Sequence, residues 1–248
     1  MSRWDIMLFA VLPYAAVAVF GVAHWWRYRR DQYGWGARST QLLESRALRY
    51  GSVAFHFGAL GAIGGHVLGI LVPHAWTDAV GVSEGMYHLV AATAGLTAGV
   101  AASAGFLILA WRRARYPRVR ATTTRMDVTV FGMLALGIAT GMVATLWGTI
   151  GEEVRYRESV APWFRSLFVL DPRPGLMGDV PFVFQLHVTS MWLLYALWPF
   201  SRLVHAWSIP VDWFRRSPIL YRGRVARARR GGRADPAGAV TMRSGPGA

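Results

Sequence analysis

The chain alternates between long apolar runs and polar stretches rich in arginine. Five apolar runs stand out, at residues 6–26, 53–72, 88–111, 128–150 and 182–198. Each is close to the roughly 20 residues that a helix needs to cross the hydrocarbon core of a bilayer. The pattern predicts an all-α integral membrane protein, a bundle of five transmembrane helices. Pro13 and Pro199 are tolerable in such helices if neighbouring groups pair with the carbonyls that they leave free.

The arginines set the expected orientation. Two loops and the C-terminal tail are strongly basic, at residues 27–49, 112–125 and 215–243. Because short cytoplasmic loops carry the excess of basic residues, we expect the N-terminus outside and the C-terminus in the cytoplasm. The aromatic, amphipathic stretch 161–170 is then expected on the outer surface. We expect residues 1–221 to form the membrane domain and residues 222–248 a basic, disordered cytoplasmic tail.

Composition narrows the chemistry. The net charge is +14, every basic residue is arginine, and 54% of the residues are hydrophobic. In a membrane chain such an excess is typical of cytoplasmic loops and lipid contact, so nucleic acid is not expected as a partner. Cysteine is absent, which excludes disulfides, iron–sulfur ligation and thiol catalysis by this chain. A metal would have to be held by His, Met or carboxylate groups.

Four of the seven histidines lie on or at the ends of the second and fifth runs, namely His56, His66, His187 and His205. An ionisable residue at membrane depth is costly and therefore indicates a function. The second helix runs outward and the fifth runs inward, which places His56 and His205 toward the cytoplasm and His66 and His187 toward the outside. Each pair can hold one haem iron through axial imidazoles, so the pattern predicts a cytochrome b with two b haems.

The expected spacing of the histidines is imperfect. Ten residues separate His56 from His66, a rise of roughly 15 Å, whereas the eighteen from His187 to His205 give roughly 27 Å and five whole helical turns. Tilt, rotated macrocycles, a bend near Pro199 or uncoiling before His205 are ways to absorb the difference of roughly 12 Å.

The ligand set favours electron transfer, because two histidines per iron leave no open coordination position. Zinc prefers a tetrahedral cluster in one small site, which histidines spread along two helices do not provide. The second run also carries four glycines between its histidines, at Gly58, Gly61, Gly64 and Gly65. Glycine lets a flat macrocycle approach the backbone, and it also lets two membrane helices pack closely. Between two histidines, the haem interpretation is favoured.

At these residues the sequence resembles the gamma (cytochrome b) subunit of the bacterial membrane-bound respiratory nitrate reductase. The similar passages are FHFGALGAIGGHVLGILVPH (55–74), YPRVRATTT (116–124) and FQLHVTSMWLLYALWPFSRLVHAWSIPV (184–211). The resemblance covers roughly residues 5–222. It implies a multi-pass protein of the bacterial cytoplasmic membrane that oxidises quinol, with menaquinol the expected species, and releases protons at the outer face.

The resemblance also implies cofactors and partners. His66 and His187 would hold the outer haem, His56 and His205 the inner one. Tyr28, Arg112 and Arg202 match positions near the inner haem propionates, and arginine pairs well with such carboxylates. Electrons would pass to an iron–sulfur beta subunit and a molybdenum alpha subunit on the cytoplasmic face. The nitrate-reducing site would lie on that alpha subunit, and the 116–124 passage is expected to dock a soluble partner.

The quinol site departs from the family. Where a known member of the family has a lysine at the outer end of the third run, this chain has Met86. His88 could supply the missing donor to the quinone oxygen, or could be an interfacial residue without a role. Glu84 also lies at this helix end, while the walls of the pocket are expected to include His66 and two glycines, Gly65 and Gly69.

Two alternatives stay open. Related cytochromes b serve hydrogenases, formate dehydrogenases and sulfur-metabolism complexes, and only the 116–124 passage and the end of the fifth run favour nitrate reductase. A transporter or a structural membrane anchor is a different class, which would use the histidines for proton relay or for nothing.

Overall fold

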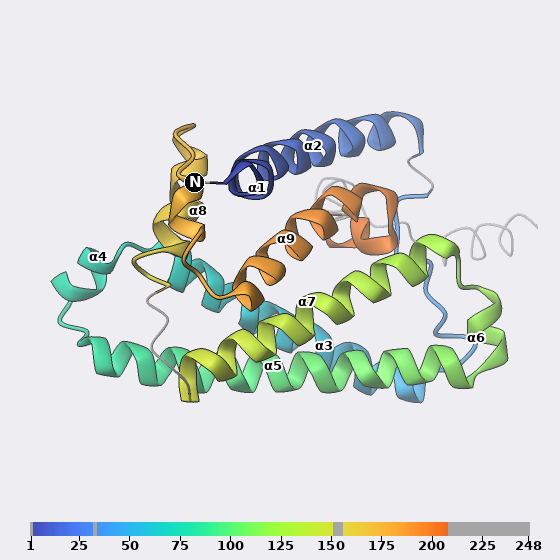
Figure 1. Cartoon of the computed structure of the whole chain (residues 1–248). Helices are drawn as coiled ribbons and strands as arrows, with labels where there is room; N and C mark the ends of the chain where they lie inside the picture. The colour runs from blue at the N-terminus through green and yellow to red at the C-terminus, as the bar shows by residue number, and fades with distance from the viewer. Residues whose placement is uncertain (1, 32–33, 151–155, 208–248) are drawn as a thin grey trace, which may run out of the picture. The chain divides into compact units, whose positions relative to one another are not determined.

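The computed structural model describes residues 2–31, 34–150 and 156–207, which belong to one compact unit and contain helices and loops but no strand (Figure 1). The elements follow in the order α1 (Arg3–Ile6), η1 (Met7–Val11), α2 (Leu12–Arg30), α3 (Arg46–His66), η2 (Val67–Leu71), α4 (His74–Ala79), α5 (Glu84–Arg115), α6 (Pro117–Ala121), α7 (Arg125–Ile150), α8 (Val160–Phe168), η3 (Pro174–Met177), α9 (Phe182–Leu197), η4 (Trp198–Phe200) and η5 (Arg202–Trp207). The expected tail, residues 222–248, lies outside the described residues.

Four helical stretches are long and apolar enough to cross a membrane, namely Arg3–Arg30, Arg46–Leu71, Glu84–Arg115 and Arg125–Gly148. They contain the first four apolar runs to within two residues at the C-terminal ends, so these helices are confirmed. Few of their residues are buried inside the protein, as expected of apolar helices that face lipid. Membrane crossing by the fifth run and the orientation of the termini stay predictions.

The first span accommodates Pro13 as the sequence requires. Proline has no N–H to give to the carbonyl four residues before it, which here belongs to Phe9. The backbone opens into the short π-helix η1, and the indole of Trp163 on α8 donates to the Phe9 carbonyl at 2.7 Å. Trp163 is fully buried, and its ring is nearly perpendicular to that of Phe9, with ring centres 5.9 Å apart. The freed carbonyl is therefore paired by a neighbour, and the aromatic stretch 161–170 inserts its tryptophan into the fold.

The long helices pack in sequence order, α3 along α5, α5 against α7, α7 against α9, and α9 against α2. Small residues allow the first of these contacts. A Cβ added at Gly58 would lie 2.2 Å from the backbone nitrogen of Ala102, and one added at Gly105 would lie 2.2 Å from that of Phe55. Such glycines let two backbones approach where lipid supplies no hydrophobic driving force.

The fifth helix matches the apolar run at 182–198 but does not continue as a regular helix to His205. The α-helix α9 stops at Leu197 and passes into two short 3₁₀ turns, η4 and η5, which are separated by Ser201 in an extended conformation. Pro199 explains the break, because it lacks an N–H and restricts the residue before it. The expectation of five continuous turns and roughly 27 Å from His187 to His205 is therefore wrong. Uncoiling before His205, one of the ways to reconcile the spacing, is what the chain does.

Candidate functional site: two facing histidine pairs

The structure brings the four histidines together in the two pairs that the sequence suggested. The rings of His66 on α3 and His187 on α9 have centres 6.0 Å apart, with an angle of 25° between their planes. The rings of His56 on α3 and His205 on η5 also have centres 6.0 Å apart, but their planes cross at 73°. Because His56 and His66 share one helix, the two pairs are separated by about 15 Å of helical rise.

All four rings are oriented through the same atom. Nδ1 of His56 bonds to the Ser52 carbonyl at 2.7 Å, and Nδ1 of His66 to the Ala62 carbonyl at 2.6 Å. Nδ1 of His187 contacts the Gly137 carbonyl at 3.1 Å, and Nδ1 of His205 the Arg202 carbonyl at 2.7 Å. A carbonyl only accepts, so in each case Nδ1 carries the proton and Nε2 carries the lone pair. A second hydrogen bond of this kind is the usual support of a metal-binding histidine.

The ring-centre spacing within each pair is close to that of two imidazoles that would hold one iron between them. A metal–imidazole bond of about 2.0–2.1 Å, plus about 1.1 Å from nitrogen to ring centre, puts two opposed ring centres about 6.2 Å apart. Two protein ligands suffice for haem, because the macrocycle supplies the other four nitrogens. Among the described residues no group of three or more His, Asp or Glu side chains is placed to hold a metal ion. The histidine pairs therefore fit haem and do not form a tetrahedral zinc site.

His24 shows that the carbonyl contact alone is not diagnostic. Its Nδ1 bonds to the Phe20 carbonyl at 2.8 Å, but the ring contacts of His24 in the described part of the chain are with Phe20 and Trp35 and not with another histidine. Its Nε2 is buried without a hydrogen-bond partner among the described residues. What distinguishes the four candidate ligands is a second imidazole at the axial distance.

The four glycines of α3 divide into two kinds. Gly58 and Gly61 contact α5, since an added Cβ would approach backbone atoms of Ala102 or the side chain of Ala98. Around Gly64 and Gly65 an added Cβ would meet nothing within 4 Å. The packing interpretation therefore applies to the first two, and the open face beside His66 is left by the last two.

Sequence reasoning missed the support of His187 by α7. A Cβ added at Gly141 would lie 3.0 Å from the His187 ring, so glycine makes the room that the ring occupies. Gly137 supplies the carbonyl for Nδ1, and the Thr140 hydroxyl lies 3.2 Å from the same nitrogen. The signal was present as Gly137-x-x-x-Gly141, a small-residue spacing typical of close contacts in membranes.

The residues expected near the inner propionates contact protein groups in this structure. Arg112 is buried, and it donates to the Glu44 carboxylate at 2.5 Å and to the Thr40 hydroxyl at 3.0 Å, clamping the loop before α3 onto α5. Burial raises the pKa of Glu44, but hydrogen bonds from the Ala47 N–H and from Arg112 outweigh it and leave the pKa below its ordinary value. Tyr28 is exposed, with its ring edge-on to a neighbouring tryptophan. Their role beside a propionate stays a prediction.

A polar cluster surrounds the other end of α5, where the quinol site is expected. Glu84 accepts from Arg157 at 2.7 Å and lies 2.7 Å from Nε2 of His74. The Arg157 guanidinium covers the ring of Tyr87 at 3.8 Å, and the hydroxyls of Tyr87 and Tyr156 are 3.1 Å apart. Burial, followed by the contact with Tyr87, raises the pKa of Tyr156 above its ordinary value, so this hydroxyl keeps its proton at neutral pH.

This cluster, which contains Glu84, reaches one of the two expected pocket glycines, Gly69. A Cβ added at Gly69 would lie 3.3 Å from the Tyr87 hydroxyl and 3.5 Å from the Tyr156 ring, so both tyrosines lie against η2 next to His66. His88 points elsewhere, because its Nε2 donates to the Gly148 carbonyl at 3.2 Å. Tyr156 and Arg157 follow a polar stretch of the sequence, and nothing in their spacing linked them to α5.

Comparison with known proteins agrees along nearly the whole chain. A model of the nitrate reductase gamma subunit family matches residues 5–224. The nitrate reductase gamma chain of Bacillus subtilis strain 168 is 40% identical over 218 residues, which cover 88% of this chain and 98% of that one. The respiratory nitrate reductase 1 gamma chain of Escherichia coli K12 is 34% identical over 225 residues, 90% and 100% of the two chains.

A longer protein matches as well. The nitrate reductase-like protein NarX of Mycobacterium tuberculosis H37Rv is 44% identical over 220 residues, which are 88% of this chain but 34% of that protein, so this chain spans about a third of its length. The family resemblance seen in the histidine-bearing passages is confirmed by a match that contains all four histidines. This chain belongs to the nitrate reductase gamma subunit family.

Proposed function

We propose that the chain is the membrane cytochrome b subunit of a quinol-oxidising nitrate reductase. It holds two b haems, takes electrons from quinol at the outer face of the bacterial cytoplasmic membrane, and delivers them to cytoplasmic iron–sulfur and molybdenum subunits that reduce nitrate to nitrite. Haem supplies reversible one-electron chemistry when bound. The observation that carries the proposal is the pair of facing histidine couples at the axial distance, in a chain of this family.

The distribution of charge supports the direction of electron flow. Arginines lie in the last turns of α2 and α5 and in α6. These turns are at the end of the bundle where His56 pairs with His205. This is the side that the positive-inside rule assigns to the cytoplasm. The His66–His187 couple then lies toward the outside, near the cluster around Glu84.

The residues around Tyr87 suit the proton side of quinol oxidation. A quinol gives up two electrons and two protons on becoming a quinone, so the site needs proton acceptors with a path to water. The half-exposed Glu84 carboxylate can take a proton, and its partner His74 can pass one on toward solvent. The paired hydroxyls of Tyr87 and Tyr156 can donate to a quinone oxygen, which is the task expected of the basic residue that Met86 replaces.

An optical and magnetic measurement tests the proposal. The purified complex should show a reduced b-type spectrum with two centres, and His66→Ala should remove one of them, while His74→Ala should keep both. In a low-spin ferric haem, crossed imidazole planes leave two iron d orbitals nearly equal in energy, which increases the g anisotropy. The couple crossed at 73° should therefore give the more anisotropic EPR signal, and His66→Ala should leave that signal in place. A haem-free protein would refute the proposal.

The partner is tested separately by copurification from membranes. A molybdenum subunit and an iron–sulfur subunit should accompany the haem-loaded chain, and a menaquinol analogue should reduce its haems. A haem-loaded chain that copurifies with a hydrogenase, a formate dehydrogenase or a sulfur-metabolism complex would keep the cytochrome and overturn nitrate reductase.

A further inference from the structure

His205 lies outside the regular α-helix that precedes it. It lies in the 3₁₀ turn η5, after the break at Pro199 and the extended Ser201. Local contacts close this turn, since the Ser201 hydroxyl donates to the Trp198 carbonyl at 2.8 Å and the Trp198 indole donates to the Leu203 carbonyl at 2.8 Å. These contacts hold the turn together but do not fix it against the rest of the bundle. His187, in contrast, sits within the α-helix α9 against α7.

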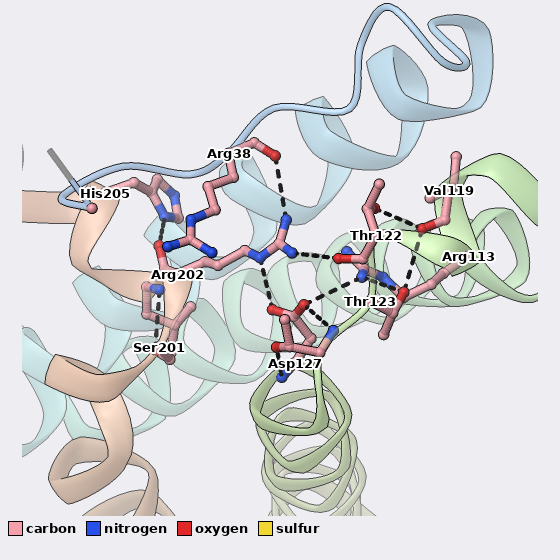
Figure 2. A network of polar contacts seen from close by, with 12 residues as sticks. Arg38, Arg113, Val119, Thr122, Thr123, Asp127, Ser201, Arg202 and His205 are labelled. Carbon is pink, nitrogen blue, oxygen red and sulfur yellow. Dashed lines mark hydrogen bonds and ion pairs between the residues drawn. The ribbon is translucent and has the colours of Figure 1, made fainter.

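Two arginines join this segment to other elements. Arg27, at the end of α2, donates to the carbonyls of Pro199 and Ser201. Arg202, inside η5, extends the other way, and its Nε lies 2.8 Å from Oδ1 of Asp127 on α7 (Figure 2). The carbonyl of Arg202 is also the group that accepts the hydrogen bond from Nδ1 of His205, at 2.7 Å. One residue therefore both anchors the segment and orients the candidate haem ligand.

Asp127 is the centre of this anchor. The residue is buried, 6% exposed, and its two oxygens have different tasks. Oδ2 accepts from the Thr124 N–H at 2.8 Å, and the Thr124 hydroxyl accepts from the Asp127 N–H at 3.2 Å, a capping box at the start of α7. Oδ1 is left to face Arg202. A buried carboxylate is costly unless paired, so its position beside Arg202 is strongly determined.

Other groups around the ion pair fix the orientation of the Arg202 guanidinium. Arg202 also donates to the Thr122 carbonyl at 2.7 Å and to the Arg38 carbonyl at 3.3 Å (Figure 2). The Arg113 guanidinium, from the end of α5, lies 3.8 Å from Oδ2 of Asp127. The planar guanidinium of Arg202 thus meets three acceptors, one at Arg38 and two in the segment 122–127, an arrangement that suits its fixed fork of donors better than the single ammonium of a lysine.

We propose that Asp127 is a positioning residue for the haem ligand His205, acting through Arg202. Asp127 holds the Arg202 side chain, and the Arg202 carbonyl holds Nδ1 of His205, so the carboxylate sets the angle at which the His205 ring faces His56. This inference rests on the proposed function, because it needs a haem between the two rings.

The test compares Asp127→Asn with Asp5→Asn in the whole complex. Asparagine can still accept from the Thr124 N–H, so the cap of α7 stays while the ion pair is lost. Asp5 is the control, since it also closes a capping box, and its side chain accepts from Ser2 at the N-terminal end of the first span. Asp127→Asn should shift the EPR signal of the haem held by His56 and His205 and leave the other haem signal in place. Asp5→Asn should change neither.

Charge and position are separated by Arg202→Gln. Asp127→Asn removes a negative charge and Arg202→Gln a positive one, so a purely electrostatic effect would move the haem potential in opposite directions and leave both EPR signals unshifted. Loss of positioning should displace the EPR signal of the same haem in both variants, with recovery in Asp127→Glu. Arg202→Gln leaves the α7 cap untouched, and decides the matter if Asp127→Asn does not assemble.

The outcomes that overturn the inference differ from those that overturn the proposed function. A wild-type complex without b haem would remove the function and the inference together. Two haems whose EPR signals stay unshifted in Asp127→Asn and Arg202→Gln would remove the positioning role alone, as would an Asp127→Glu variant that behaves like the asparagine variant.

Discussion

Gly58 fixes how closely α3 and α5 approach, and replacing it with alanine should loosen the bundle. The new Cβ would lie 2.2 Å from the Ala102 nitrogen and 2.7 Å from the Ala98 carbonyl oxygen, both backbone atoms that no rotamer change can move. Restoring contacts of about 3.5 Å requires the helices to separate by roughly 1 Å. Overpacking of this kind costs about 1–3 kcal/mol, and the better helix propensity of alanine returns about 1 kcal/mol at most.

Two further glycines make the comparison decisive. Gly132 lies exposed in α7 with nothing within 4 Å of an added Cβ, so Gly132→Ala should be neutral or slightly stabilising. Gly64→Ala should also leave the stability unchanged. It should weaken haem binding at His66, because the added methyl group fills the open face of α3 beside that histidine. The assay is thermal unfolding of the detergent-purified complex, with haem content measured in parallel. If Gly58→Ala has the same melting temperature as Gly132→Ala, the close contact of α3 with α5 is not what holds these helices together.

Three other changes have defined outcomes. Trp163→Phe leaves the carbonyl that the indole N–H now pairs without a partner, so the free energy of unfolding should fall by about 1–3 kcal/mol in a thermal melt; an unchanged melt would mean that water or lipid headgroups reach this carbonyl. Gly141→Val should displace the His187 ring and remove one of two b centres from the optical spectrum, while equal loss of both would contradict a local effect. Glu44→Gln should destabilise the Arg112 clamp at neutral pH. Because the pKa of Glu44 is lowered by folding, its stabilisation is present above the ordinary value of 4.5 and disappears as pH falls through the folded value, so wild type and variant should converge in acid.

The sequence was sufficient for the helices and for the pairing of the histidines. An uninterrupted apolar run has few alternatives to a helix in lipid, since every backbone group must be paired within the segment. Antiparallel helices then place the first histidine of one run beside the last of the other, which is why His56 met His205 and His66 met His187.

What the sequence could not supply depends on neighbours rather than on the segment itself. Gly58 and Gly64 look alike in the α3 sequence, and only the position of α5 makes one a packing contact and leaves the other open. The same holds for Trp163, whose partner carbonyl is 154 residues away. A period along one helix reports which residues share a face, but not which face meets another helix.

The end of the fifth run shows why one of the two histidine couples needs more support than the other. The position of His187, a candidate ligand, is fixed by the regular helix α9 and by glycines on α7. After the break at Pro199, His205 no longer has the support of a regular helix. The break also lets the His205 ring lie beside the His56 ring, whereas a straight helix would have placed it farther along. Two charged side chains take the place of the lost helical hydrogen bonds. Arg27 of α2 donates to the Ser201 carbonyl, and Arg202 pairs with Asp127 of α7. These contacts restrict the position of the turn that carries His205, and on the proposal above it is the His56–His205 couple that a single buried carboxylate, Asp127, tunes.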